Sequence, residues 1–299
     1  MIHPGSDTGR PQVHFPIIPD GGEAACTIHV AGMVQSVVFR NAVVIEPEGG
    51  IIMKVRMFVG PVLLVAVGWS SWVFTQEVGR EEQPARVLRI RQTADFIVNG
   101  RGDALVWKAV AWEPLHPRIA DAHQYGTRVK MLYSGTGLYV LMEAEDRTIT
   151  ATMNEDFLDL WKEDVFEFFL WPDERYPVYF EYEISPLGFE LPILIPNFGG
   201  EFLGWRPWRY DGPRKTQKAT TVVGGARQSG ARVTGWKAEV FVPYELLKPL
   251  QNVPPQSGTR WRANFYRMDY DDGKNTSWDW ARVGRSFHEF EKFGTLVFE

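Results

Sequence analysis

The chain has 299 residues, of which 44% are hydrophobic and 14% aromatic, and its formal net charge is -5 at pH 7. This is the composition of a globular protein with an unusually large aromatic share, and its mild acidity without any Lys/Arg block argues against a nucleic-acid partner. The single cysteine, Cys26, excludes an intramolecular disulfide and any cysteine-based zinc site.

A leader-like segment begins late in the chain. Residues 53–56 are a short basic stretch, and the apolar run of residues 57–74 follows and ends at polar residues. This layout predicts a signal peptide over residues 53–75, and hence an extracellular or periplasmic protein. The run is just long enough to span a bilayer, so a retained anchor over 57–74 is the alternative, and contact with a membrane is expected only in that case.

Residues 1–52 precede this leader and have mixed polarity with Gly and Pro. Because a signal peptide normally starts a chain, we expect Met53 to be the true start. Residues 1–52 are then an over-long gene call without structure. The folded domain is expected to span residues 77–299.

This remaining stretch is rich in strand patterns and contains no internal repeat. Alternating or continuous apolar residues predict strands at 127–133, 138–142, 165–170, 178–184, 219–223, 235–242, 259–267 and 294–298. One helical turn is expected at 243–247. Residues 191–215 are broken by Pro and Gly and predict a long loop. Many strands with almost no helix predict an all-β domain built as a two-sheet antiparallel β-sandwich.

The stretch from Asn154 to Leu170 is the most informative segment for function. Trp161 follows a loop that carries several acids, and Glu167 interrupts an apolar strand. An indole stacks on the C–H face of a sugar while carboxylates accept its hydroxyl protons, so this combination suits a carbohydrate ligand. The alternative is a Trp at the edge of the core beside solvated acids.

Two more acids, Glu181 and Glu183, share one face of the predicted strand 178–184. A carboxylate pair is the equipment of a glycoside hydrolase. Their spacing does not match the Glu-x-Asp-x-x-Glu pattern of sandwich-type retaining enzymes. A solvated strand face, or pairing with Arg262 or Arg267, is therefore the favoured interpretation.

The loop 191–215 carries Trp205 and Trp208, which are expected either to contact a glycan or to pack on the sandwich. The acids Asp164, Asp269 and Asp271 are candidate cation ligands, because residues 269–275 alternate oxygen-bearing side chains. That run lacks the closing acid of a calcium loop and also fits an ordinary turn.

Several motifs in order resemble the family 9 carbohydrate-binding modules. They are Trp107, Leu138-Tyr-Val, Trp161-x-x-Asp164-x-x-Glu167, Ile184-Ser-Pro-x-Gly188, Gly235-Trp-x-Ala-Glu239-Val-x-Val-Pro243, Trp261-x-x-Asn264-x-x-Arg267 and Phe287-His-x-x-x-x-Phe293-Gly294-x-Leu296. The resemblance covers residues 97–298. It implies a jelly-roll sandwich, binding of poly- or oligosaccharides, calcium in some members, and association with secreted enzymes that degrade polysaccharides.

The resemblance also implies roles for particular residues. Trp161 matches the first of two aromatic walls of a sugar slot, Glu167 matches its carboxylate, and Phe287 matches the second wall, where the sugar-binding members have tryptophan. A basic residue of those members falls near Glu183 here. We add Trp280, with Trp205 and Trp208, to the candidate carbohydrate-binding residues.

Three functions follow from these observations. The first is a non-catalytic carbohydrate-binding domain of an exported protein. The second is a glycoside hydrolase or lyase that uses Glu167 with Glu181 or Glu183. The third is an accessory cell-surface interaction domain that binds no sugar.

Overall fold

The computed structural model describes residues 24–30, 33–39, 86–119, 123–199 and 201–299. The chain divides into two compact units, Met1–Gln76 and Glu77–Glu299. In the first unit, strands β1 (Ala24–Val30) and β2 (Met33–Phe39) form an antiparallel pair, which is more structure than the sequence predicts for residues 1–52. The leader expected over 53–75 lies outside the described residues. No helix among the described residues is long and apolar enough to cross a membrane.

The second unit consists of strands joined by loops and short helical turns. The strands are β3 (Val87–Gln92), β4 (Glu113–Pro117), β5 (Thr127–Tyr133), β6 (Gly137–Glu145), β7 (Val165–Trp171), β8 (Val178–Ile184), β9 (Glu190–Phe198), β10 (Glu201–Phe202), β11 (Arg206–Pro207), β12 (Gln217–Val223), β13 (Gly235–Pro243), β14 (Arg260–Asp269), β15 (Thr276–Asp279) and β16 (Gly294–Phe298). The helical turns are η1 (Leu105–Ala109), η2 (Leu160–Lys162), η3 (Gly212–Arg214), α1 (Tyr244–Leu247), η4 (Asp271–Gly273) and η5 (Phe290–Lys292).

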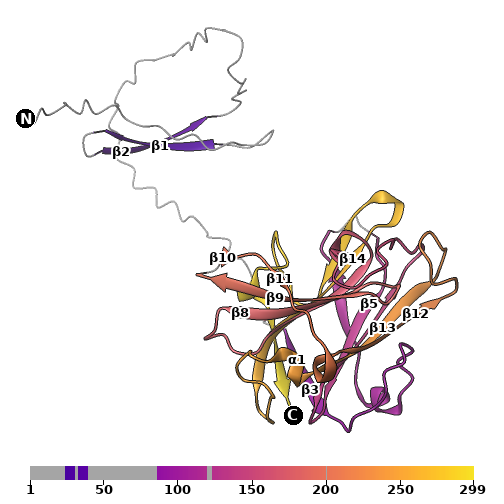
Figure 1. The fold of residues 1–299 in the computed structure, drawn as a ribbon. Coiled ribbons are helices and arrows are strands. Elements are labelled where there is room, and N and C mark those ends of the chain that lie inside the picture. The colour runs from indigo at the N-terminus through magenta and orange to yellow at the C-terminus, as the bar shows by residue number, and fades with distance from the viewer. Residues whose placement is uncertain (1–23, 31–32, 40–85, 120–122, 200) are drawn as a thin grey trace, which may run out of the picture. The chain divides into compact units, whose positions relative to one another are not determined.

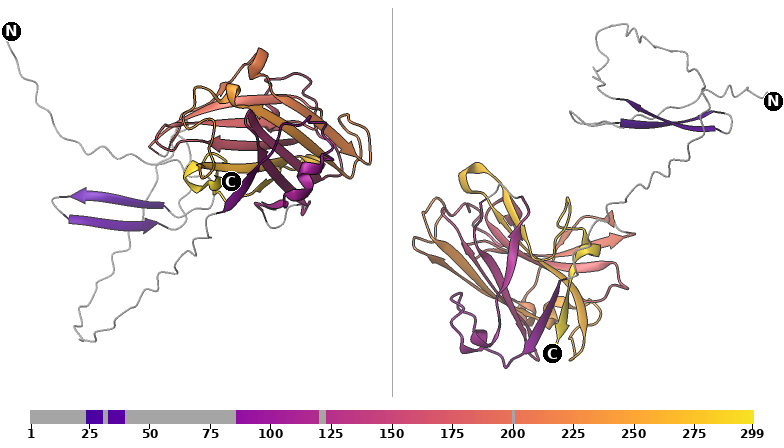
Figure 2. Two further views of the ribbon diagram at one scale, coloured as in Figure 1. Left: turned by 90° about the horizontal axis from the view of Figure 1, so that it is seen from below. Right: turned by 180° about the vertical axis from the view of Figure 1, so that it is seen from behind.

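These strands form two layers, which can be followed in Figures 1 and 2. One layer has the order β9-β8-β7-β14, and both β15 and β16 pair with β14. The other has the order β12-β13-β6-β5, and both β3 and β4 pair with β5. The pairs β15–β4 and β16–β3 connect the layers. The predicted all-β sandwich is confirmed, and within the described residues only β3 departs from the antiparallel pattern, because it runs parallel to β16 and β5.

Strands with a clean apolar alternation fall where the sequence predicts them, and the bounds of β5, β8 and β16 match the prediction. The prediction of a long loop over residues 191–215 is wrong at its start, because β9 runs through Pro192 and Pro196. On the β8 side of β9, Asn197 N–H donates to Pro177 O. On the opposite side, Pro192 O accepts from Trp208 N–H and Pro196 O accepts from Leu203 N–H. The proline nitrogens, which carry no hydrogen, therefore point toward the two-residue strands β10 and β11. Few hydrogen bonds are lost on that side of β9.

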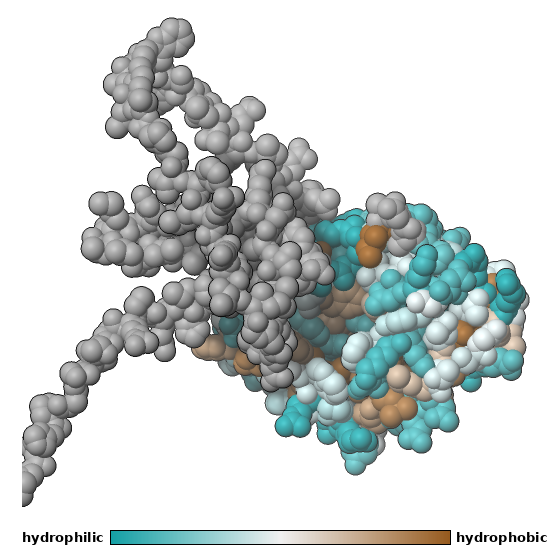
Figure 3. All heavy atoms as spheres, turned by 90° about the horizontal axis from the view of Figure 1, so that it is seen from above, coloured by the Kyte–Doolittle hydropathy of each residue, from teal (hydrophilic) through white to brown (hydrophobic). Residues whose placement is uncertain are grey.

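The main core lies between the two layers. It includes Phe166 and Trp236, whose rings stack with centroids 3.7 Å apart across the layers. A second buried cluster lies on the opposite face of the β7–β8–β14 layer, and loop residues such as Leu160 and Phe290 cover it. We call this the outer face. On the side of the molecule seen in Figure 3, the described surface is mostly hydrophilic with scattered hydrophobic residues.

Candidate functional site

Three glutamates lie side by side on the outer face of the β7–β8–β14 layer. Glu167 of β7 is the cross-strand partner of Glu183 on β8 and of Tyr266 on β14. Glu181 is two residues from Glu183, so both side chains leave the same face of β8. The intervening Tyr182 belongs to the main core, which places the three carboxylates on the opposite side. We call Glu167, Glu181 and Glu183 the acidic floor.

The acidic floor is buried, so the expectation of a solvated face is wrong. The pairing expected with Arg262 or Arg267 is also absent. Arg262 donates to Phe293 O and lies 3.4 Å from Glu174, and Arg267 pairs with aspartates. Sequence alternation shows that two side chains share a face, but it does not show that loops cover that face.

Burial dominates the electrostatics of the acidic floor. It raises the pKa of Glu167 to about 8. The pKa values of Glu181 and Glu183 lie well above their usual range, first because of burial and then because of the neighbouring carboxylates. Glu183 Oε2 accepts a hydrogen bond from Trp161 N–H at 2.9 Å, and the side chains of Glu181 and Glu183 hydrogen-bond to each other. Glu181 Oε2 and Glu183 Oε1 are buried without a hydrogen-bond partner.

Trp161 stands at the edge of the acidic floor. It belongs to η2, whose first residue, Leu160, is buried in the outer-face cluster and anchors the turn. The carbonyl of Trp161 accepts a hydrogen bond from Tyr270 Oη at 2.8 Å. Its ring is turned outward, because the residue remains 43% exposed. Lys162 Nζ lies 5.0 Å from the centre of the same ring. Trp161 is therefore a fixed, accessible aromatic surface beside buried carboxylates.

Phe287 occupies the other side of the outer face, but its ring is not a free-standing wall. It stacks on Tyr266 with centroids 4.0 Å apart and planes inclined by 7°. The Arg118 guanidinium carbon lies 4.9 Å from the Phe287 centroid, and Tyr266 Oη donates to Phe287 O. A ligand would therefore meet Phe287 as part of an aromatic and cationic stack.

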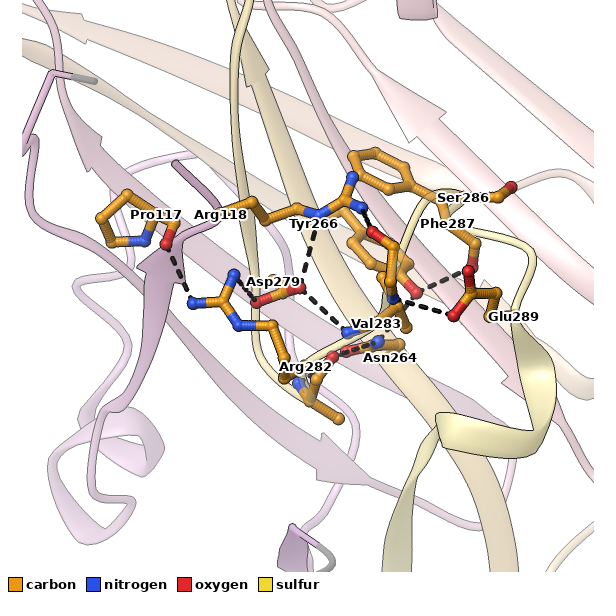
Figure 4. A network of polar contacts seen from close by, with 12 residues as sticks. Pro117, Arg118, Asn264, Tyr266, Asp279, Arg282, Val283, Ser286, Phe287 and Glu289 are labelled. Atoms are coloured by element: carbon orange, nitrogen blue, oxygen red, sulfur yellow. Dashed lines mark hydrogen bonds and ion pairs between the residues drawn. The ribbon is translucent and has the colours of Figure 1, made fainter. Parts of the chain in front are cut away.

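A polar network fixes the segment that carries Phe287 (Figure 4). Asp279 accepts Val283 N–H at 3.1 Å and lies 3.5 Å from Arg118 and 3.4 Å from Arg282. Asn264 donates to Tyr266 Oη at 2.7 Å and exchanges two hydrogen bonds with the backbone of Ala281. These bonds hold the loop after β15 against β14.

The remaining tryptophan candidates lie elsewhere. Trp205 is exposed on the segment before β11. Trp208 is half-buried against the main core, and its ring N–H donates to Leu246 O at 2.8 Å, so its packing role is confirmed. Trp280 is buried in the main core against Phe265 and leaves no ring face for a ligand. Its place among the sugar-binding candidates is therefore corrected.

The aspartates expected to bind a cation lie in two different environments. Asp269 and Asp271 come together with Asp146, which the sequence did not suggest, with ligand oxygens within 4.8 Å of one another. The fully buried Arg267 guanidinium already lies among them. It donates to Asp146 Oδ2 at 3.1 Å and to Asp269 Oδ2. Asp164 instead accepts the N–H groups of Thr150 and Tyr270. Arg267 therefore supplies positive charge to Asp146 and Asp269, whereas Asp271 Oδ1 is buried without a hydrogen-bond partner.

Sequence reasoning missed several residues that shape the site. Tyr266 and Tyr270 reach it only because β14 pairs with β7. Arg118 comes from the segment after β4. His288 Nδ1 and Tyr179 Oη are joined by a hydrogen bond of 2.7 Å, and the His288 ring stacks on Phe202. Burial lowers the pKa of His288 to about 4, so this ring is neutral at pH 7. No local signal identifies contacts made between such distant segments.

The acidic floor predicts that stability depends on pH. A folded-state pKa of about 8 for Glu167, against 4.5 when unperturbed, means that the folded protein keeps a proton that the unfolded chain releases. This contribution is fully present below pH 4.5 and is lost as pH rises toward 8. The depressed pKa of His288 acts in the opposite direction only between about 4 and 6.5. We therefore expect the free energy of unfolding to fall from pH 6.5 to pH 8.

Denaturant titrations at a series of pH values would measure this fall. Glu167→Gln is expected to make it shallower, because the amide carries no titrating proton. Glu174→Gln, an exposed change of the same kind, is the matched control and should keep the wild-type slope. Equal slopes in all three proteins would contradict the prediction.

Comparisons with known proteins identify the fold. No protein-family model matches the chain, and no curated protein matches it. A putative carbohydrate-binding protein from Bacteroides uniformis ATCC 8492 superposes with a TM-score of 0.60 at 16% identity, over 72% of this chain and 100% of that chain.

Two structures of a family 9 carbohydrate-binding module from Caldicellulosiruptor kristjanssonii also superpose, each at 16% identity over 72% of this chain. The complex with cellotriose gives a TM-score of 0.50 and is covered over 94% of its length. The complex with glucose gives 0.51 and is covered over 96%. The domain after residue 77 therefore has the β-sandwich fold of the family 9 carbohydrate-binding modules.

Proposed function

We propose that this chain contains a non-catalytic carbohydrate-binding domain of an exported protein, which recognises a poly- or oligosaccharide. The observation that carries the proposal is the exposed, anchored ring of Trp161 directly beside the acidic floor. A rigid indole stacks on a sugar ring at little entropic cost, and carboxyl oxygens accept its hydroxyl protons. The shared fold supports the proposal, because its solved examples include sugar complexes.

Export is part of the same proposal. It rests on the basic and apolar segment over residues 53–75, which lies outside the described residues. Carbohydrate recognition also suits a location where polysaccharides occur. Cleavage of this segment, measured by mass spectrometry of the secreted protein, would test it.

The acidic floor does not favour the alternative of a glycoside hydrolase. Such an enzyme needs two carboxyl groups in different environments, one protonated and one ionised. Here burial raises the pKa of all three glutamates together. No member of the acidic floor has a cationic partner among the described residues that would keep it ionised.

A panel of insoluble and soluble polysaccharides tests the proposal directly. We expect the purified protein to be retained on at least one polysaccharide without releasing new reducing ends. Release of reducing ends that Glu167→Gln abolishes would support the hydrolase instead. Retention on none of the panel would favour an interaction domain that binds no sugar.

A further inference from the structure

We propose that the site selects glycans with free amino groups, and that Glu181 and Glu183, with Glu167, receive the ammonium of a hexosamine unit stacked on Trp161. This inference rests on the carbohydrate-binding function proposed above. It adds the chemical class of the ligand, a positively charged amino sugar rather than a neutral one.

The arrangement of the acidic floor is the first argument. Glu167 and Glu183 are directly opposite on adjacent strands, and Glu181 lies on the same face two residues away. Side chains at such positions have Cβ atoms about 4.5–5.5 Å apart, and like charges there destabilise a sheet. Three acids in this geometry need either retained protons or a positive charge brought to them.

The second argument is that the acceptor oxygens have too few donors. Glu181 Oε2 and Glu183 Oε1 are buried and without a partner, in two residues that are each at least 95% buried. Among the described residues, Trp161 N–H donates to Glu183, and the Glu181 and Glu183 side chains hydrogen-bond to each other. Buried acceptors are normally satisfied, so vacant ones beside an exposed aromatic ring point to donors supplied by a ligand.

The third argument is that nearby basic side chains are engaged elsewhere. Lys162 Nζ pairs with Asp159 at 2.6 Å, and Arg118 pairs with Asp279. Lys218 Nζ lies 3.1 Å from Glu190. Among the described residues, no ion pair reaches the acidic floor. An ammonium group would supply three N–H donors and the missing charge, whereas a sugar hydroxyl would supply one donor and no charge.

Trp161 and Tyr270 border the acidic floor. The Trp161 ring faces solvent, and a ring of this kind accepts both the C–H face of a sugar and a nearby ammonium. Tyr270 is partly exposed, and the carboxylates of Glu167 and Glu183 raise its pKa after burial, which places this side chain close to the acidic floor. A hexosamine stacked on Trp161 would have its amine on the side of the acidic floor.

Proton exchange gives the site a measurable signature. Burial and mutual repulsion keep protons on the acidic floor in the free protein. An ammonium brought to these carboxyl groups favours their ionised form, so binding of an amino sugar should release protons. A neutral sugar should show no such release.

Isothermal titration calorimetry with the full chain tests the inference with three short ligands. They are a glucosamine tetramer with free amines, its fully N-acetylated counterpart, and cellotetraose. We expect the free-amine tetramer to bind at least tenfold more tightly than the other two. Its heat should depend on the ionisation enthalpy of the buffer, which reports the released protons.

Glu181→Gln and Glu183→Gln are expected to lower this affinity about tenfold and to reduce the proton release. Glu174→Gln is the matched control, because it makes the same chemical change at an exposed position just after β7. An equal loss in the control would mean that general surface charge attracts the ligand, and would overturn the inference. Because proton release is measured in the wild-type protein, the test does not depend on the folding of the variants.

The outcomes separate the two proposals. Binding of cellotetraose as tight as that of the free-amine tetramer would overturn the amino-sugar inference and leave carbohydrate binding standing. Binding of none of the three ligands, together with no retention on the polysaccharide panel, would overturn both. Tight binding of the free-amine tetramer without proton release would also overturn the role given to the acidic floor.

Discussion

Replacing Arg267 by methionine is expected to lower the free energy of unfolding by about 3–5 kcal/mol, because it leaves buried carboxylates without their cation. Arg267 is fully buried, donates to Asp146 and Asp269, and has Trp278 under its guanidinium at 4.7 Å. Methionine fills much of the same volume but supplies neither charge nor donors. Chemical denaturation monitored by tryptophan fluorescence would measure the loss.

The pH dependence of this variant separates lost charge from lost packing. Burial already raises the pKa of Asp146 to about 6 in the presence of Arg267. Without the guanidinium its folded-state pKa should rise further, so the variant should be least destabilised near pH 5 and most destabilised near pH 8. A packing defect would give the same loss at both pH values.

Two controls accompany this experiment. Arg89→Met removes an exposed pair with Glu299 and is expected to cost less than about 1 kcal/mol. Because Arg267 already compensates the charge of Asp146 and Asp269, we expect EDTA to leave the wild-type melting temperature unchanged. A loss under 1 kcal/mol in Arg267→Met, or a marked effect of EDTA, would contradict this view of the cluster.

The features that sequence predicts well here are those written in local patterns. Strand β8 alternates aromatic and acidic residues, and a sandwich layer requires one of these faces to meet the core. The aromatic face does so, which fixes the orientation of Glu181 and Glu183. The position of Trp161 just before β7 is also local, because a short turn precedes that strand.

The features that sequence does not predict depend on distant segments. Arg267 and Asp146 are 121 positions apart in the sequence, so the local motif that suggests calcium does not show that a guanidinium pairs with these aspartates. The acidic floor is buried because residues near 160 and 290 fold over it, although the strand itself reads as half polar. Phe287 has the right residue type for a wall, but its stacking on Tyr266 depends on the pairing of β14 with β7.

The burial of three carboxyl groups in the acidic floor affects both stability and ligand recognition. A buried cluster of acids lowers the free energy of unfolding at high pH. Each carboxyl group must either keep its proton or be ionised without water around it, and both states cost free energy there. Natural sandwiches fill such positions with apolar residues, as this chain does at Phe169 and Leu191 on the same outer face. Carboxyl groups at these positions, beside an exposed indole, lower the stability of the fold and supply acceptors for a ligand. Functional sites often show this trade-off.

Replacing Trp161 by alanine is expected to weaken binding of the best-retained glycan about fivefold, since a good aromatic stack contributes on the order of 1 kcal/mol. The melting temperature should change little, because the side chain is largely in solvent and Leu160 anchors the turn. Affinity electrophoresis and calorimetry would measure the first effect, and thermal unfolding the second. Trp161→Phe should retain part of the affinity.

Trp205→Ala is the comparison that locates the site, because Trp205 is 41% exposed, close to the value for Trp161, but lies outside the outer-face cluster. Its loss should leave binding within about twofold of wild type if the sugar stacks at the acidic floor. A large loss of binding in Trp205→Ala with little loss in Trp161→Ala would instead place the binding site on the segment before β11. Because both substitutions remove an exposed indole, the difference between them reports position rather than residue type.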